Sequence, residues 1–434
     1  MNRISKIIST KITDDFTQKA LKWSQKYDEM VFLESNKDVQ TIREKYGELD
    51  AILAVGSQIS LAVGHRNAFE QLKQFQAEIQ DFLFGYLSYD LKNDIEELSS
   101  ANKDHLNFPE LFFFQPKKIF IWKNNTLQLL YLPAYSDEMN KDLDDIGQIS
   151  LLPEIPFSKP AIFSRLSKDA YFKKVSNVME HIHRGDIYEV NFCQEFYAEQ
   201  CDIDTLKVYK KLNEISLAPF ASYLKLKDKY LLCASPERFV KKAGEKIIVQ
   251  PIKGTARRLL DENEDQKLAD SLALDPKERA ENIMIVDLLR NDLSKNALKG
   301  SVMVEELCRV YSFKQVHQLI STVVCRVSPD ENPVEIIKNL FPMGSMTGAP
   351  KISAMKIIEE EEETKRGLYS GAVGYISPDN NFDFNVVIRS ILYNRSEKYA
   401  SFSVGSAITS QSIIEKEYEE CLLKAKALKE ALQG

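Results

Sequence analysis

Apolar and polar residues alternate through much of the chain, a pattern typical of β-strands with one buried face. The alternation is clearest in three consecutive stretches, "IYEVNFCQEFYAE", "ASYLKLKDKYLLCAS" and "ERFVKKAGEKIIVQPI". Short polar turns separate strands of this kind, which favours antiparallel pairing. Earlier in the chain, "DAILAVG" and "FLFGYLSYD" predict two more strands. Further strands are expected at 302–312, 317–327, 368–377, 382–393 and 398–407.

A second set of segments has the spacing of amphipathic helices, with apolar residues three and four apart. The pattern predicts helices in "HRNAFEQLKQFQAEIQDF" and "SKDAYFKKVSNVMEHIHRGD" and at 276–292, 333–340 and 413–432. Asp275 is expected to cap the helix at 276–292, with Pro276 in its first position, and Ser412 is expected to form a capping box with Glu415. Strand runs interrupted by helices indicate an α+β protein with a large antiparallel sheet system.

Length and composition narrow the class of protein. The 434 residues are 44% hydrophobic, enough for a large core, and carry a net charge of −7, which argues against nucleic-acid binding. No stretch approaches the roughly 20 apolar residues of a membrane helix. The six cysteines are scattered and form no CxxC pair, so we expect a soluble, reduced, cytoplasmic protein. An acidic, proline-containing stretch at 134–160 is the predicted linker between an N-terminal region, 1–155, and a second region, 160–434.

Glutamates recur three residues apart on two of the predicted helices. The pairs are Glu278 with Glu281, and Glu417 with Glu420. Residues with this spacing share a helix face, and either pair alone is typical of a solvated surface; Glu278 also suits a helix cap. Together the two faces could converge on one Mg²⁺, which prefers oxygen ligands. Lys424, one turn further, could hold a carboxylate of an anionic substrate.

Other candidate residues stand alone in their segments. Arg389 lies within the apolar "VIRS" and is a candidate carboxylate clamp, because a charge in such a strand is seldom left unpaired. Glu237 in "SPERF" fits either an exposed turn or a general acid beside a pocket. His317 fits a core histidine or a site residue. The turns "GSMTGAPK", which contains Thr347, and "SVGSAIT", which contains Gly405, could offer backbone amides to an anion or be plain turns.

Seven segments occur in an order that resembles the chorismate-utilising enzymes. They are "GDIYEVNFCQEF", "SPERFV", "PIKGTARR", "DPKERAENIMIVDLLRNDL", "GSMTGAPK", "GAVGYIS" and "EKEYEECLLKAKA". The resemblance is strong over roughly 165–430 and weaker before it. It implies an α+β fold of two large, mostly antiparallel sheets packed as a sandwich, with helices outside.

The resemblance also separates branches of the family at Lys253. Anthranilate synthases carry alanine there, whereas aminodeoxychorismate synthases carry a lysine that attacks carbon 2 of the chorismate ring. An amine must lose its proton to be a nucleophile, and partial desolvation is expected to lower the pKa of Lys253. Gly254 would let the ring approach the backbone. The alternative is that Lys253 is a surface lysine.

Further roles follow from the resemblance alone. It implies Glu281 and Glu420 as Mg²⁺ ligands, supported by Glu278 and Glu417, and Glu237 as the acid for the departing hydroxyl. The implied substrate contacts are Gly254, Thr255, His317, Thr347, Tyr375, Arg389, Gly405 and Lys424. Glu189 replaces the usual glutamine, and a lysine there marks the branch that activates water, so isochorismate synthesis is disfavoured.

The implied function is therefore conversion of chorismate and ammonia to aminodeoxychorismate in 4-aminobenzoate synthesis. The chain lacks the G-x-C-x-G turn of a glutamine amidotransferase, so a separate glutaminase subunit is the expected partner. Anthranilate synthesis is the first alternative, and a non-catalytic chorismate-binding homologue is the second.

Overall fold

The computed structural model describes residues 2–9, 14–36, 47, 49–123, 125–151, 159–313 and 316–434. Within them, twenty strands form one hydrogen-bonded set in which every strand pair is antiparallel. The set divides at the long strand β5 (Leu111–Lys123), which pairs with β3 (Ala51–Val63) on one edge and with β4 (Leu83–Leu87) and β6 (Thr126–Tyr131) on the other. The strand β1 (Ile4–Ser9) completes this end beside β6.

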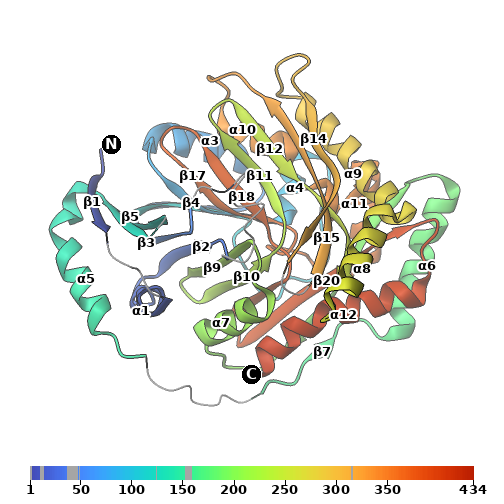
Figure 1. Cartoon of the computed structure of the whole chain (residues 1–434), viewed down its shortest axis with the longest axis horizontal. Coiled ribbons are helices and arrows are strands. Elements are labelled where there is room, and N and C mark those ends of the chain that lie inside the picture. Colours follow the sequence, from blue (N-terminus) through green and yellow to red (C-terminus); the bar gives the residue numbers. More distant parts are fainter. Residues whose placement is uncertain are drawn as a thin grey trace.

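From the two edges of β5, the strands continue as two branches that form the two layers of the fold (Figure 1). The first runs from β3 through β2 (Glu29–Glu34), β9 (Phe220–Leu226), β10 (Lys229–Ser235), β19 (Ser390–Asn394), β20 (Tyr399–Thr409) and β8 (Glu189–Ala198), with the short β7 (Phe163–Ser164) and β16 (Gly348–Ala349) beside β8. The second runs from β4 through β17 (Ala372–Ile376), β18 (Phe382–Val386), β11 (Arg238–Ala243), β12 (Lys246–Gln250) and β15 (Val316–Arg326), which pairs with β13 (Ile252–Arg257) and β14 (Met303–Ser312).

Alternation along the strands sends neighbouring residues to different cores. Val31 of β2 joins a core cluster that also contains Val240 of β11 and Val373 of β17, so side chains of both branches meet there. Phe32 points the other way and packs in a second cluster with residues of the helices outside the first branch. The α+β, two-layered, antiparallel fold predicted from the sequence is confirmed, with its two layers continuous through β5.

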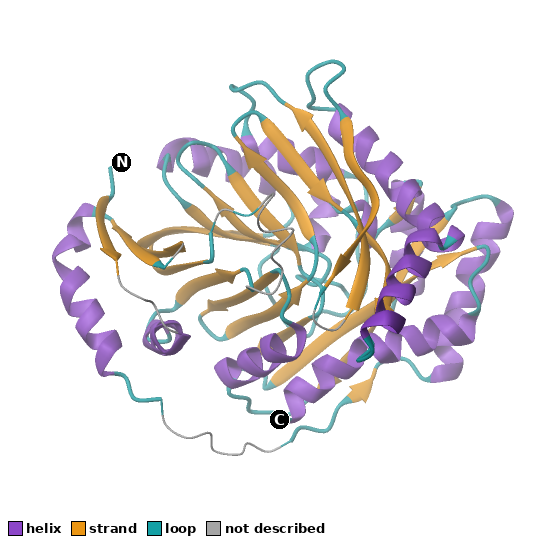
Figure 2. Cartoon of the chain, in the orientation of Figure 1, coloured by secondary structure: helices purple, strands orange, loops and turns teal. Residues whose placement is uncertain are grey.

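Helices cover the outside of the strands (Figure 2). They are α1 (Asp14–Ser24), α3 (Ala68–Ile79), α4 (Lys92–Ile95), α5 (Met139–Gln148), α6 (Lys168–Arg184), α7 (Thr205–Ser216), α8 (Glu262–Leu274), α9 (Pro276–Ser294), α10 (Pro333–Leu340), α11 (Lys351–Glu361) and α12 (Ile414–Gln433). Three 3₁₀ turns are η1 (Tyr89–Leu91), η2 (Pro133–Glu138) and η3 (Gly344–Met346). None of the helices in the described residues has the length and apolar character needed to cross a membrane.

The two predicted helix caps differ in outcome. Asp275 accepts a hydrogen bond from the Glu278 backbone N–H at 3.0 Å, as expected for the start of α9. The predicted capping box at Ser412 is wrong, because Ile413 is the N-cap of α12 and has no side-chain cap. Ser412 instead accepts a hydrogen bond from the Thr409 backbone N–H at 3.1 Å and holds the turn between β20 and the helix.

The predicted linker differs from the structure over part of its length. Residues 139–148 form α5, whose Met139, Asp142 and Ile146 are buried, while 152–158 lie outside the described residues. Strands from either side of this stretch pair directly, β2 with β9 and β4 with β17. The division into 1–155 and 160–434 stays a prediction.

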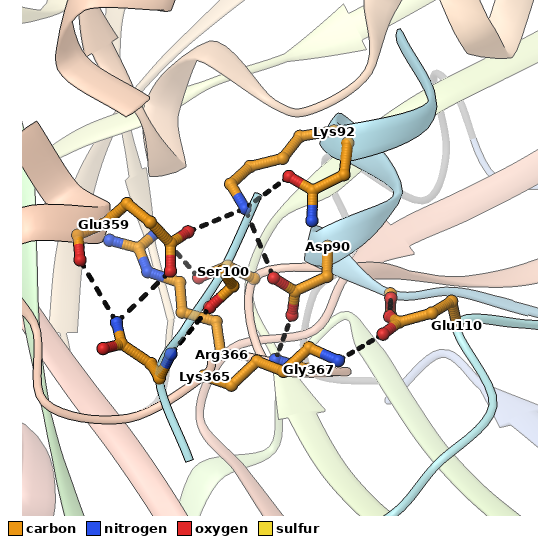
Figure 3. Close-up of polar contacts among 12 residues, drawn as sticks. Asp90, Lys92, Ser100, Glu110, Glu359, Lys365, Arg366 and Gly367 are labelled. Carbon is orange, nitrogen blue, oxygen red and sulfur yellow. Dashed lines mark hydrogen bonds and ion pairs between the residues drawn. The ribbon is translucent and has the colours of Figure 1, made fainter. Parts of the chain in front are cut away.

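A buried ion-pair network fastens the N-terminal region to the end of α11 (Figure 3). Lys92, whose side chain is fully buried, contacts Glu359 at 2.9 Å and Asp90 at 3.3 Å. Asp90 also accepts the Gly367 backbone N–H at 2.9 Å, and Lys365 pairs with Glu110. A buried cation of this kind is stable only when its partners are in place, so the network holds the loop after α11 in one position.

Candidate active site

A cavity of about 1030 Å³ lies between β13, the middle of β20, and helices α9 and α12. Eleven of the fourteen predicted site residues line it: Glu237, Lys253, Gly254, Thr255, Glu278, Glu281, Arg389, Gly405, Glu417, Glu420 and Lys424. These residues come from segments up to about 190 positions apart in the sequence. The fold therefore gathers them into one pocket.

The other three predicted residues do not line the cavity. His317 is buried on β15, where its Nε2 lies 3.0 Å from Asp265 and its Nδ1 lies 2.8 Å from the Ser312 hydroxyl. The Thr347 hydroxyl is turned back to the backbone carbonyls of η3. Tyr375 stacks on Phe84 with ring centroids 5.5 Å apart and lines a separate small cavity.

The cavity wall includes residues that the sequence did not single out. Tyr369, six residues before Tyr375 in the strand predicted at 368–377, lines the cavity together with Asn191, Ser345 and Lys277. Tyr369 stands in the turn before β17, whereas Tyr375 is within the strand. Tyr375 pairs with Phe84 of β4. Only the bounds of β17 show that Tyr369, and not Tyr375, reaches the cavity.

Lys253 reaches the cavity because β13 is irregular at that point. Ile252 pairs with Ile320 and Thr255 with Gln318, so β13 has one more residue than β15 over this interval. An extra residue of this kind is a β-bulge, which re-aims the side chains beside it. Gly254 has φ +83°, and a Cβ there would lie 3.0 Å from a Glu278 carboxylate oxygen. Glycine is therefore required after the lysine.

The Lys253 amine is paired with a buried carboxylate. Its Nζ lies 2.5 Å from Oε1 of Glu189, whose side chain is 1% exposed. Burial lowers the pKa of Lys253, but Glu189 first, and then Glu281 and Glu237, raise it, and the net direction is upward. The expectation of a lowered pKa was wrong because the replacement of glutamine by Glu189 outweighs desolvation.

Glu237 is in position to carry a proton. It follows β10 in a tight turn and accepts a hydrogen bond from the Ser345 hydroxyl at 2.6 Å. Burial raises its pKa from 4.5 to about 7, against the smaller lowering effects of Ser345 and Lys253. A carboxyl with a pKa near neutrality can donate a proton at physiological pH.

Four glutamates of α9 and α12 line the same cavity. Burial raises the pKa of Glu281 to about 7 and that of Glu278 in the same direction. The pKa of Glu420 is lowered, because Lys424, 2.5 Å away, and Lys277 outweigh its burial. Lys277 lies 3.8 Å from both Glu281 and Glu417. Carboxylates crowded in this way favour a bound cation.

The fit of a divalent cation rests on the donor chemistry. Oε1 of Glu281 is buried and has no hydrogen-bond partner in the described residues. In this arrangement, no three His, Cys, Asp or Glu side chains of the described chain lie close enough to form a complete metal site. Mg²⁺ usually takes one or two carboxylates and completes its shell with waters and substrate. Glu281 with a carboxylate of α12 matches that requirement.

Arg389 lies in a loop and not, as predicted, within a strand. The expected strand at 382–393 is divided into β18 and β19, and Arg389 between them has φ +51°. Burial lowers the pKa of its guanidinium. Its side chain lines the cavity, where a planar fork of donors can bind a carboxylate through two hydrogen bonds.

A buried arginine joins the segments behind the cavity. Arg366 contacts Glu362 through two nitrogens, at 2.6 and 2.9 Å. It also donates to the backbone carbonyls of Asn191 and Met346, each at 2.7 Å. Both of those residues line the cavity, so this ion pair fixes the positions of β8 and η3 relative to each other.

Comparison with known proteins identifies the protein family of this chain. Residues 20–430 match the family model described as chorismate binding enzyme. Aminodeoxychorismate synthase component 1 of Escherichia coli is 38% identical over 352 residues, 80% of this chain and 76% of that protein. Anthranilate synthase component 1 of Thermus thermophilus is 33% identical over 357 residues, 80% and 77% of the two chains. The crystal structure of anthranilate synthase component I from Streptococcus pneumoniae has a TM-score of 0.78 and 25% identity, covering 87% of this chain and 91% of that one. The chain belongs to the chorismate-binding enzyme family.

Proposed function

We propose that this chain is an aminodeoxychorismate synthase component I, which converts chorismate and ammonia to 4-amino-4-deoxychorismate. The observation that carries the proposal is the position of Lys253, whose side chain stands on the cavity wall at a bulge in β13. The anthranilate branch of the family has alanine at this position. Relatives of both branches match the chain at similar identity, so Lys253 is the feature that separates them.

The chemistry divides into two displacements. In the first, the Lys253 nitrogen forms a bond to ring carbon 2, the two ring double bonds shift toward carbon 4, and the 4-hydroxyl leaves as water with a proton from Glu237. In the second, ammonia forms a bond to carbon 4, both double bonds shift back, and the bond from carbon 2 to Lys253 breaks. Glu237 regains a proton from the new ammonium group. A covalent intermediate of this kind replaces one difficult step by two easier ones.

The two carboxylates of chorismate require cationic partners. We assign Arg389 to the enolpyruvyl carboxylate, because its guanidinium has no side-chain hydrogen bond in the described residues and faces the cavity. The ring carboxylate would lie at the end of the cavity that α9 and α12 form. Lys424 is held there by Glu420 at 2.5 Å and by the Gly405 carbonyl at 2.8 Å.

We further propose that Mg²⁺ is the cofactor, held by Glu281 and Glu420, with Glu278 and Glu417 in support. When bound it would act as a Lewis acid on the ring carboxylate and favour loss of the hydroxyl. The buried Glu281 oxygen, which accepts no hydrogen bond in the described residues, and the raised pKa values of Glu278 and Glu281 support this assignment.

Ammonia is proposed to come from a separate glutamine amidotransferase subunit. The support is the absence from the sequence of the cysteine turn that such an enzyme needs. The matching relatives are named as "component 1" of their synthases, which is consistent with a partner subunit. Free ammonium is expected to replace that partner in vitro.

Substitution of the nucleophile tests the proposal. Lys253→Ala is expected to lower the rate of aminodeoxychorismate formation from chorismate, Mg²⁺ and ammonium by at least 100-fold, because it removes the amine that forms the covalent intermediate. Product formation is measured by liquid chromatography with mass detection. Lys426→Ala, a lysine at the cavity rim, is the control and is expected to retain most of the activity. Full activity in Lys253→Ala would remove the basis of the proposal.

A further inference from the structure

Glu189 is the group in closest contact with the proposed nucleophile. It is the first residue of β8, is 1% exposed, and places Oε1 2.5 Å from the Lys253 Nζ. Lys253 lines the cavity and Glu189 does not. The carboxylate therefore contacts the amine from the protein side and leaves the side that faces the cavity open to substrate.

The hydrogen bonding of Glu189 suits a base. A carboxylate that accepts two or three hydrogen bonds is a weak base, because each bond stabilises the charged form. In the part of the chain that the structure describes, Lys253 is the only donor to Glu189, and its buried Oε2 has no partner. Within the described residues, the hydrogen bond from Lys253 is thus the one that stabilises this charge.

The surroundings of Lys253 make an internal base necessary. Its amine faces Glu189 from β8, Glu237 from the turn after β10, Glu281 and Glu278 from α9, and Glu420 from α12. All five are carboxyl groups, and the pKa of the amine is raised despite its burial. At neutral pH the lysine rests as an ammonium ion, which has no lone pair for attack.

We propose that Glu189 is a further catalytic residue, the proton acceptor that produces the neutral Lys253 amine and later returns the proton. Glu189 takes a proton from the ammonium, and the freed electron pair forms the bond from nitrogen to ring carbon 2. When ammonia has entered at carbon 4 and that bond breaks, the lysine leaves as a neutral amine, and protonated Glu189 gives its proton back. Each turnover restores both groups, and no other reactant is needed. This inference rests on the proposed function.

The proposal predicts a particular dependence on pH. The resting pair, ammonium with carboxylate, and the reactive pair, amine with carboxylic acid, hold the same number of protons, so the wild-type step needs no proton loss to solvent. In Glu189→Gln the lysine must lose its proton to solvent. The ratio of kcat in Glu189→Gln to kcat in wild type is therefore expected to rise about tenfold per pH unit from pH 6 until the amine is deprotonated, with a deficit of roughly 100-fold at the acid end. The ratio cancels the titration of Glu237, which both enzymes share.

Two variants control for structural effects. Glu195→Gln removes another buried carboxylate of β8, which pairs with Arg165 at 2.9 Å and does not line the cavity; its activity ratio to wild type is expected to be independent of pH. Glu189→Asp retains a carboxylate that is one methylene shorter. It is expected to be slower than wild type by a factor that does not change with pH.

The outcomes separate the two proposals. The product assay with wild type and Lys253→Ala tests the function, and the pH ratio tests Glu189. If wild type forms aminodeoxychorismate through Lys253 but the Glu189→Gln ratio is flat across pH 6–9, Glu189 only positions the lysine and the inference is overturned. A Glu189→Gln enzyme faster than wild type at every pH would also overturn it, because the carboxylate would then restrain the amine.

Discussion

At the scale of single residues, burial decides which groups can move a proton. Desolvation raises the pKa of Glu237 and that of Glu281 to about 7. Neighbouring lysines lower the pKa of Glu420 and keep it ionised. Carboxyl groups whose environments separate their pKa values commonly take different roles in one site. Glu237, whose carboxyl accepts a hydrogen bond from the Ser345 hydroxyl, is the one assigned to proton donation.

The raised pKa of Glu237 has a consequence for stability. Between pH 4.5 and 7 the unfolded chain has lost a proton that the folded chain keeps, so the free energy of unfolding falls as pH rises through this window. Glu237→Gln cannot ionise and keeps an acceptor for Ser345. The free energy of unfolding of the variant minus that of wild type is therefore expected to be larger at pH 8 than at pH 5, by on the order of 3 kcal/mol. Denaturant unfolding at the two pH values measures the difference.

An exposed glutamate of α12, Glu415, provides the control for this experiment. Glu415→Gln is expected to show the same pH dependence of unfolding as wild type. A Glu237→Gln difference from wild type that is equal at pH 5 and pH 8 would mean that Glu237 titrates normally in the folded chain.

Residue types and motif order located most of the cavity, but not all of it. Lys253 and the four glutamates could be located because they stand in segments that resemble those of the chorismate-utilising enzymes. Tyr369 could not be separated from Tyr375, because the strand predicted at 368–377 contains both and only the start of β17 decides which side chain reaches the cavity. The Glu189 contact could not be predicted from the sequence either, because it depends on how β8 of one branch and β13 of the other lie against each other in the fold.

At the scale of elements, periodicity predicted the bounds of α9, α10 and α12 closely. The predictions of a helix cap and of one strand were wrong where tertiary contacts determine the local structure. Ser412 supports a turn instead of capping α12, and Arg389 interrupts what the apolar pattern predicts as a single strand. Helices α9 and α12 each supply two of the four carboxylates that line the cavity.

This convergence predicts how the enzyme depends on metal. Removal of Mg²⁺ with a chelator is expected to abolish turnover, and Glu281→Gln is expected to raise the Mg²⁺ concentration for half-maximal rate at least tenfold, because it removes a carboxylate ligand. Steady-state rates over a range of Mg²⁺ concentrations measure both effects. Glu419→Gln, on the exposed side of α12, serves as the control. Unchanged turnover in the presence of chelator would contradict the metal assignment.

At the scale of the whole molecule, the α+β class and the antiparallel pairing could be predicted from alternation and short turns. The division of the sheet at β5 could not, because β3 and β4 both pair with that strand from opposite edges. This division allows β13 of one branch and β20 of the other to face the same cavity. The active site is thus a product of the complete fold.

The measurement that tests the central claim most directly is the identity of the product. The purified chain is incubated with chorismate, Mg²⁺ and ammonium at mildly alkaline pH, and the products are resolved by mass spectrometry. We predict a product that retains the enolpyruvyl group and has an amine in place of the 4-hydroxyl. Anthranilate and pyruvate would instead contradict the role assigned to Lys253 and place the chain in the anthranilate branch of its family.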